Sequence, residues 1–112
     1  MAKVWETDSR DTAHCWVTFQ GTSTVAVKSG HNVSSVTDLG TGNYRVNFSV
    51  SARNDLYAVT GMAMDPTNDF PGMAPYRRSD STTNSTQCQI ETWYNNATYD
   101  CLRVYIVIHC RK

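Results

Sequence analysis

Apolar and polar side chains alternate along much of this chain, which is the period of β-strands with one buried face. The clearest case runs to Val50, with Tyr44, Val46, Phe48 and Val50 on one face and polar residues on the other. The preceding residues 38–43 (DLGTGN) supply two glycines, an aspartate and an asparagine, the residue types that a tight reversal needs. Residues 33–50 therefore predict a hairpin whose first strand is shorter and less regular than its second.

The same alternation predicts strands on both sides of this hairpin. They are Cys15–Gln20, Thr24–Lys28 followed by a bulge or bend at residues 29–31 (SGH), Leu56–Met64, Cys88–Trp93 and Leu102–Cys110. The last is apolar on one face and half apolar on the other, so it is expected at the centre of a sheet or under a partner. Met62 and Met64 are interpreted as core filling or a subunit contact. No segment has a helical period, so we predict an all-β fold, a small antiparallel β-sandwich of about seven strands.

Two segments fall outside the strand pattern. Residues 1–12 are mostly polar and are interpreted as an arm before a single domain, residues 13–112. Residues 65–87 hold all three prolines, which lack the backbone donor that a sheet uses, and are predicted to form one long irregular loop. Long loops are often functional, although an ordinary surface loop or packing on a sister subunit is the alternative. The candidate receptor or partner contacts in this loop are Phe70, Met73, Tyr76, Arg77 and Arg78.

The charge balance argues against two classes of partner. The chain has ten basic and ten acidic residues, so neither a nucleic-acid binder nor a polybasic membrane anchor is expected. No apolar run approaches the roughly 18 residues of a membrane span. Residues 1–15 also lack the apolar core of a signal peptide. We therefore expect synthesis in the cytoplasm of a host cell.

The sequence shows no catalytic signature. The histidines, His14, His31 and His109, belong to no pattern of nucleophile and base. Residues 40–42 (GTG) lack the third glycine and the following helix of a phosphate-binding loop. We therefore expect neither enzymatic activity nor a cofactor.

Four cysteines leave three outcomes open: buried thiols, at least one disulfide, or a metal site. Cytoplasmic synthesis disfavours disulfides, although they can form after lysis. Residues 14–15 and 109–110 are both His-Cys, but neighbours on a strand point to opposite faces, so neither dipeptide can chelate zinc. A contact between Cys15 and Cys110, as thiols or as a disulfide, is expected instead. The remaining candidates for such a contact are Cys88 and Cys101.

Aromatic and amide side chains cluster around a predicted turn at residues 94–100. Rings can stack on sugars and amides can bond to hydroxyls, so this cluster is a candidate contact with a receptor glycan. Burial of the rings in the sandwich or in a subunit interface is the alternative. The members of the cluster are Trp93, Tyr94, Asn95, Asn96 and Tyr99.

Residues 32–48 (NVSSVTDLGTGNYRVNF) resemble a segment that recurs in phage virion proteins, especially at the tips of tail fibres. The family pattern is N-V-S-S-[IV]-T-D-x-G-T-G-[DN]-Y-x-V-N-F. Residues 16–22 (WVTFQGT) and 57–59 (YAV) are similar to the segments that flank it, so the resemblance covers residues 16–64. The chain departs from the pattern in having four cysteines and no long fibre shaft before the domain. The resemblance implies a role on the virion surface, and a homotrimer.

One hypothesis and two alternatives follow. The first is a non-enzymatic tail-fibre or fibre-tip protein on the virion surface. Its expected partners are its own copies, other phage virion proteins and a host surface glycan or protein. The second is a capsid decoration or cement protein on the phage head, which the missing shaft favours. The third is a free lectin-like binding module.

Overall fold

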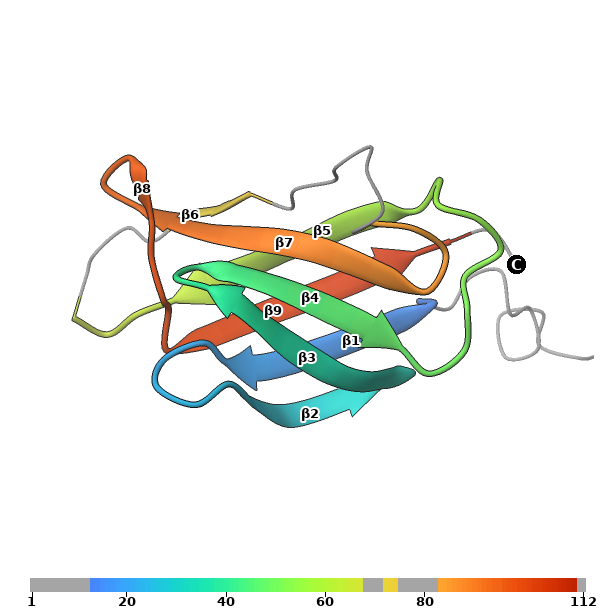
Figure 1. Cartoon of the computed structure of the whole chain (residues 1–112), viewed down its shortest axis with the longest axis horizontal. Helices are drawn as coiled ribbons and strands as arrows, with labels where there is room; N and C mark the ends of the chain where they lie inside the picture. The colour runs from blue at the N-terminus through green and yellow to red at the C-terminus, as the bar shows by residue number, and fades with distance from the viewer. Residues whose placement is uncertain (1–12, 68–71, 75–82, 111–112) are drawn as a thin grey trace, which may run out of the picture.

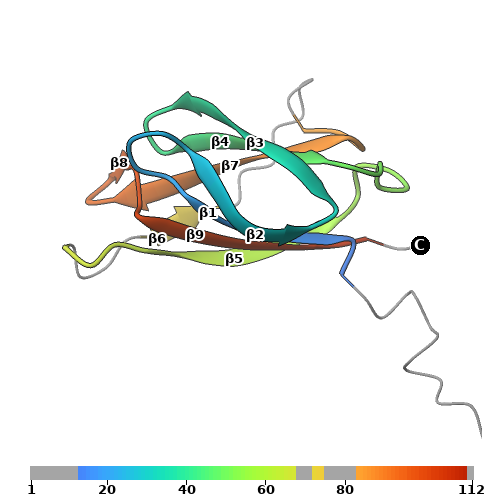
Figure 2. The ribbon, with the colours of Figure 1, turned by 90° about the horizontal axis from the view of Figure 1, so that it is seen from below.

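Nine strands form two antiparallel sheets in this computed structural model, which describes residues 13–67, 72–74 and 83–110 (Figure 1). The strands are β1 (Cys15–Gln20), β2 (Ala26–His31), β3 (Val33–Gly40), β4 (Asn43–Phe48), β5 (Ala58–Met64), β6 (Gly72–Ala74), β7 (Gln87–Tyr94), β8 (Ala97–Thr98) and β9 (Arg103–His109). One sheet has the order β2-β1-β9-β5; the other has the order β3-β4-β7-β6, with β8 paired to β7. Figure 2 shows the two layers edge-on. The predicted β-sandwich is confirmed, and β6 and β8 are short additions to its seven longer strands.

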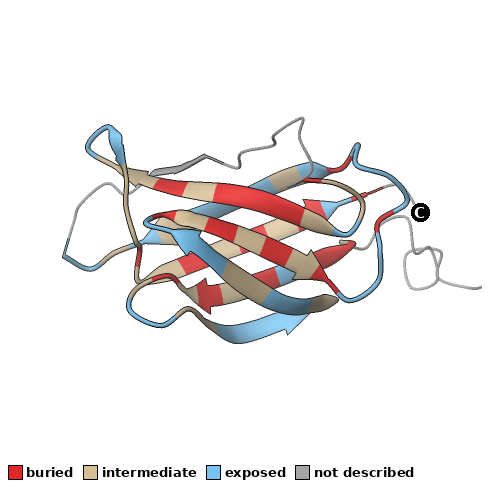
Figure 3. Ribbon diagram, in the orientation of Figure 1, coloured by how far each residue is buried: buried red, intermediate tan, exposed pale blue. Residues whose placement is uncertain are grey.

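The core lies between the two sheets. Every second residue of the central strands is buried there, which gives the alternating bands of Figure 3. Full burial of one large apolar side chain stabilises the fold by about 1.5–3 kcal/mol. The main contributors are Cys15, Val17 and Phe19 of β1, Tyr44, Val46 and Phe48 of β4, Cys88 and Ile90 of β7, and Val104, Ile106 and Ile108 of β9.

The turn between β3 and β4 is built on Gly42, whose φ is +64°. Its backbone N–H donates to the Asp100 carboxylate at 2.7 Å, and its carbonyl accepts from the N–H of Thr92 at 2.8 Å. A Cβ at this position would lie 2.6 Å from the carbonyl oxygen of Thr92. The close approach and the positive φ together explain why the turn needs glycine there.

The chain crosses from one sheet to the other at Asn32, which has a φ of +56°. Its side chain donates to the carbonyl of His14 at 3.0 Å and accepts from the N–H of Val50 at 2.8 Å. The predicted interruption of the strand by a bulge or bend at residues 29–31 is wrong in position, because β2 continues through them to His31. The irregularity falls at Lys28, where the pairing of β1 with β2 skips one residue.

Three further predictions differ from the structure. Val50 is 66% exposed, because β4 ends at Phe48 and the chain leaves the sheet. The strand expected from Leu56 begins at Ala58, and Leu56 itself is 75% exposed. The loop expected over residues 65–87 contains β6 and ends before Gln87, the first residue of β7.

The central placement expected for the last strand is confirmed. β9 lies between β1 and β5, with Trp16 opposite Val107 on one side and Thr60 opposite Val107 on the other. No helix among the described residues is long and apolar enough to cross a bilayer.

Candidate functional site

The two outer faces of the sandwich differ in chemistry. The outer face of the β3-β4-β7-β6 sheet is polar, and its side chains bond to one another. Asn47 donates from its amide to the hydroxyls of Ser35 at 3.0 Å and Thr37 at 2.9 Å. Gln89 donates to the side-chain oxygen of Asn43 at 2.7 Å. Three buried polar atoms of this face have no hydrogen-bond partner among the described residues: Arg45 Nε, Gln89 Oε1 and Trp93 Nε1.

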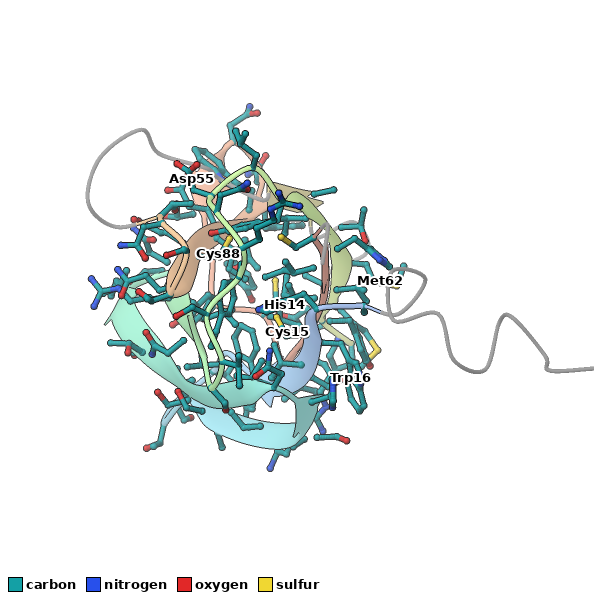
Figure 4. The ribbon with its side chains drawn as sticks, turned by 90° about the vertical axis from the view of Figure 1, so that its right-hand side faces the viewer. His14, Cys15, Trp16, Asp55, Met62 and Cys88 are labelled. Carbon is teal, nitrogen blue, oxygen red and sulfur yellow. The ribbon has the colours of Figure 1, made fainter. Side chains whose placement is uncertain are left out.

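The outer face of the β2-β1-β9-β5 sheet is apolar along its middle. Trp16 of β1 stands opposite Val107 of β9, and Met62 of β5 stands opposite Tyr105 of β9. Trp16, Met62 and Met64 are 38%, 64% and 45% exposed. Figure 4 shows Trp16 and Met62 on one side of the sandwich, with Cys15 on the interior side of the sheet. We name the apolar strip by its five members: Trp16, Met62, Met64, Tyr105 and Val107.

Basic and titratable side chains line the apolar strip. His31 pairs with Trp16, Arg103 pairs with Met64, and His109 pairs with Ala58, all at outward positions. No aspartate or glutamate occupies an outward position of β1, β2, β5 or β9. The outward strand positions of this face therefore combine an apolar centre with basic and titratable side chains and carry no carboxylate.

The sequence indicated the apolar strip only in part. The two signals were the half-apolar second face of residues 102–110 and the Met62–Met64 pair. The interpretation of this pair as core filling is wrong, since both side chains face outward and are exposed. The interpretation as a subunit contact stays a prediction.

The aromatic turn forms the hairpin of β7 and β8. Asn95 and Asn96 are its two turn residues, with φ of +54° and +64°, and both are exposed. This is the two-residue reversal that asparagine favours. The rings of Tyr94 and Tyr99 pack on each other with centroids 5.4 Å apart. The structure therefore brings all five predicted residues to one hairpin, with the two asparagines at its tip and the rings of Tyr94 and Tyr99 in contact.

Trp93, the fifth member, lies on the opposite face of β7 from Tyr94, because successive strand residues alternate. It pairs with Thr98 of β8 and with Gly72 of β6. Its indole N–H is buried without a hydrogen-bond partner among the described residues. Trp93 therefore belongs to the same hairpin, but its side chain lies on the other face from Tyr94.

The loop candidates are only partly placed by the structure. Met73 lies in β6, with its backbone opposite Thr92. The other four candidates lie outside the described residues: Phe70, Tyr76, Arg77 and Arg78. Their role stays a prediction.

All four cysteines are buried, and none is joined in a disulfide. The residue opposite Cys15 is Ile108, and Cys110 lies just beyond the end of β9. Burial raises the pKa of the Cys101 thiol above its usual value. The expected contact between Cys15 and Cys110 stays a prediction.

The His-Cys dipeptides do not build a metal centre. The Nε2 atom of His14 lies 3.0 Å from the carbonyl oxygen of Val50, and its ring packs edge-on against Phe48. Across the parts of the chain that the structure describes, no group of three His, Cys, Asp or Glu side chains is placed to hold a metal ion. No pocket opens on this part of the chain either.

Comparison with known proteins gives no match. No protein-family model, no curated protein and no solved structure is similar to this chain at a significant level. Functional inference therefore depends on the apolar strip, the β7–β8 hairpin and the resemblance of residues 32–48.

Proposed function

We propose that this chain is a non-enzymatic structural protein of a bacteriophage virion, located at a tail fibre or its tip. The observation that carries the proposal is the place of residues 32–48 in the fold. Asn32 makes the corner between the sheets, Gly42 makes the turn, and Tyr44 is a fully buried core residue. The residues that resemble virion proteins are thus the ones that determine this sandwich, which supports a shared fold.

The apolar strip supports assembly. Tryptophan, tyrosine and methionine are enriched at protein interfaces, and a flat sheet face that carries them is suited to contact another protein. The partners proposed are further copies of the chain, a trimer by the resemblance, and other virion proteins. From the resemblance we propose that the assembled protein lies on the virion surface after synthesis in the host cytoplasm.

The ends of the domain support a host contact at the β7–β8 hairpin. The start of β1 lies beside the end of β9, since Cys15 pairs with Ile108. Figure 1 shows this end on the right and the β7–β8 hairpin at the opposite end of the sandwich. A domain attached to a particle near residue 13 would therefore present Asn95 and Asn96 outward.

Competition for adsorption tests this location. Host cells are incubated with the purified protein and then mixed with the phage that encodes it. A fibre-tip protein should lower the fraction of adsorbed phage in proportion to its occupancy of the receptor. Unchanged adsorption at saturating protein would contradict the fibre-tip role.

A head decoration protein is the second candidate, and the exposed apolar strip on one sheet face favours it. A cement protein needs one broad contact face against the capsid lattice and no receptor site. In that case the purified protein would leave adsorption unchanged, and particles lacking it would lose DNA at a lower temperature than complete particles. A free lectin-like module, the third candidate, would instead bind glycan without any particle.

A further inference from the structure

The four sheet edges are protected to different degrees. Natural proteins protect edge strands with charges, bulges or short length, because an open edge pairs with other strands. The edge strand β2 carries Lys28 in a register irregularity, and β3 has two irregularities and Asp38. β6 and β8 are three and two residues long. All of these edges are therefore unsuited to regular pairing.

The fourth edge, β5, lacks every one of these protections. Its seven residues, AVTGMAM, contain no charge and no proline, and its register with β9 is regular. It is the last strand of its sheet, so its outer side has no neighbouring strand among the described residues. Five of its residues are exposed. One of them is Gly61, which has no side chain, so the backbone itself is accessible there. The strand is thus an open, uncharged edge next to the apolar strip.

We propose that β5 pairs antiparallel with β5 of a second copy of this chain. Antiparallel pairing of two identical strands about a twofold axis is self-complementary, so each edge offers the donors and acceptors that the other needs. The absence of charge means that no like charges meet at the seam, as they would between two copies of β2 at Lys28. A strand of another protein could form the same backbone hydrogen bonds with β5, but its side chains would not be related to those of β5 by the twofold axis.

The register follows from pairing all seven residues of both strands. Gly61 then faces Gly61 of the second copy, and Thr60 faces Met62 of the second copy. On the outer face, the row of Trp16, Val107 and Thr60 continues into Met62 and Tyr105 of the second copy. The two apolar strips become one continuous outer surface, and the side chains that lie opposite each other across the seam gain contacts.

Pairing through β5 joins copies two at a time. The assembly is therefore predicted to hold an even number of chains: two, or six where the threefold association implied by the resemblance also forms. This inference does not depend on the virion role, because a free lectin with the same edge would pair in the same way.

Lysines at the seam test the pairing. In the T60K/M62K variant, lysines stand directly opposite lysines of the second copy, and like charges at such positions are destabilising. Native mass spectrometry and light scattering over a concentration series should show an even-numbered wild-type assembly and at least tenfold weaker association for the variant. The matched control is S29K/H31K, which adds two lysines to exposed positions of the other edge of the same sheet and should associate like wild type.

A charge exchange separates pairing from general damage. T60K/M62K mixed with T60E/M62E should form mixed dimers, since each lysine then faces a glutamate. A wild-type protein that is monomeric or purely trimeric would overturn the proposal. So would equal weakening by both lysine variants, or failure of the mixture to associate while both variants remain folded by circular dichroism.

Discussion

The hydroxyl of Tyr44 donates a hydrogen bond to the carboxylate of Asp100 at 2.9 Å. Tyr44 belongs to β4 of one sheet, and Asp100 precedes β9 of the other. The same carboxylate oxygen accepts the N–H of Gly42, and the carbonyl oxygen of Gly21 lies 2.9 Å from the tyrosine hydroxyl. One buried junction therefore ties together the β3–β4 turn, the β1–β2 loop and the segment before β9.

Removal of this hydroxyl should destabilise the fold. Tyr44→Phe leaves the ring in the core but deletes a bond to a charged group, which is worth about 1.5–3 kcal/mol. Urea unfolding should report a loss of that size in the free energy of unfolding. Tyr105→Phe, on the outer face, is the matched control and should change stability by less than about 0.5 kcal/mol. Equal effects of the two substitutions would show that the junction contributes nothing specific.

Alkaline pH should weaken the same junction. Burial first, and then the hydrogen bond with Asp100 and its negative charge, raise the pKa of Tyr44 well above its ordinary value of 10.0. Above pH 10 the unfolded chain loses this proton while the folded chain keeps it, so stability falls by about 1.4 kcal/mol per pH unit for this group. The stability advantage of wild type over Tyr44→Phe should therefore shrink above pH 10. An advantage that stays constant up to pH 11.5 would contradict the burial of a neutral hydroxyl.

Two glycines of the hairpin turn should respond differently to alanine. A Cβ at Gly42 would collide with the carbonyl oxygen of Thr92, whereas a Cβ at Gly40 would have no atom within 4 Å. Gly42→Ala should lower the free energy of unfolding by about 3 kcal/mol or more, from the collision and the backbone strain together. Gly40→Ala, with strain alone, should cost clearly less. Thermal unfolding of the two variants side by side measures the difference, and a reversed order would rule out the close packing of the turn.

The two turn asparagines allow a backbone role to be separated from a binding role. Glycine accepts positive φ, so N95G/N96G should keep the hairpin, while N95A/N96A should lose about 1–2 kcal/mol per residue. If the amides contact the host receptor, N95G/N96G should unfold like wild type but compete poorly for phage adsorption. Full competition by this variant would remove the asparagine side chains from the proposed receptor contact.

The cysteines should be reduced and protected in the folded protein. All four are at most 8% exposed, and thiol reagents need an accessible thiolate. Ellman's reagent should therefore titrate close to zero thiols in the native protein and four after denaturation, without added reductant. Fewer than four thiols in the denatured protein would show that a disulfide forms.

Local alternation was enough to locate the seven longer strands of this fold, and the bounds predicted for β1 match those observed. It could not find β6 or β8, because two or three residues are too few to display a period. It also misjudged Val50, since nothing in the sequence marks the point where β4 leaves the sheet.

The apolar strip shows a second limit of alternation. Met62 and Met64 share one face of β5, but Val59 and Ala63 on the other face are apolar as well, so the inward face could not be chosen from the pattern. The edge position of β5 is equally invisible, because strand order depends on contacts between distant segments. The turn at Asn95 and Asn96 was identified from the sequence because asparagine favours the positive φ of a two-residue turn, which depends only on neighbouring residues.

The copy number of this protein per virion tests the virion role most directly. Purified particles of the encoding phage are digested, and quantitative mass spectrometry compares this chain with the major capsid protein. The fibre-tip role predicts a handful to a few dozen copies per particle. Hundreds of copies would indicate head decoration instead, and complete absence from the particle would contradict the virion role itself.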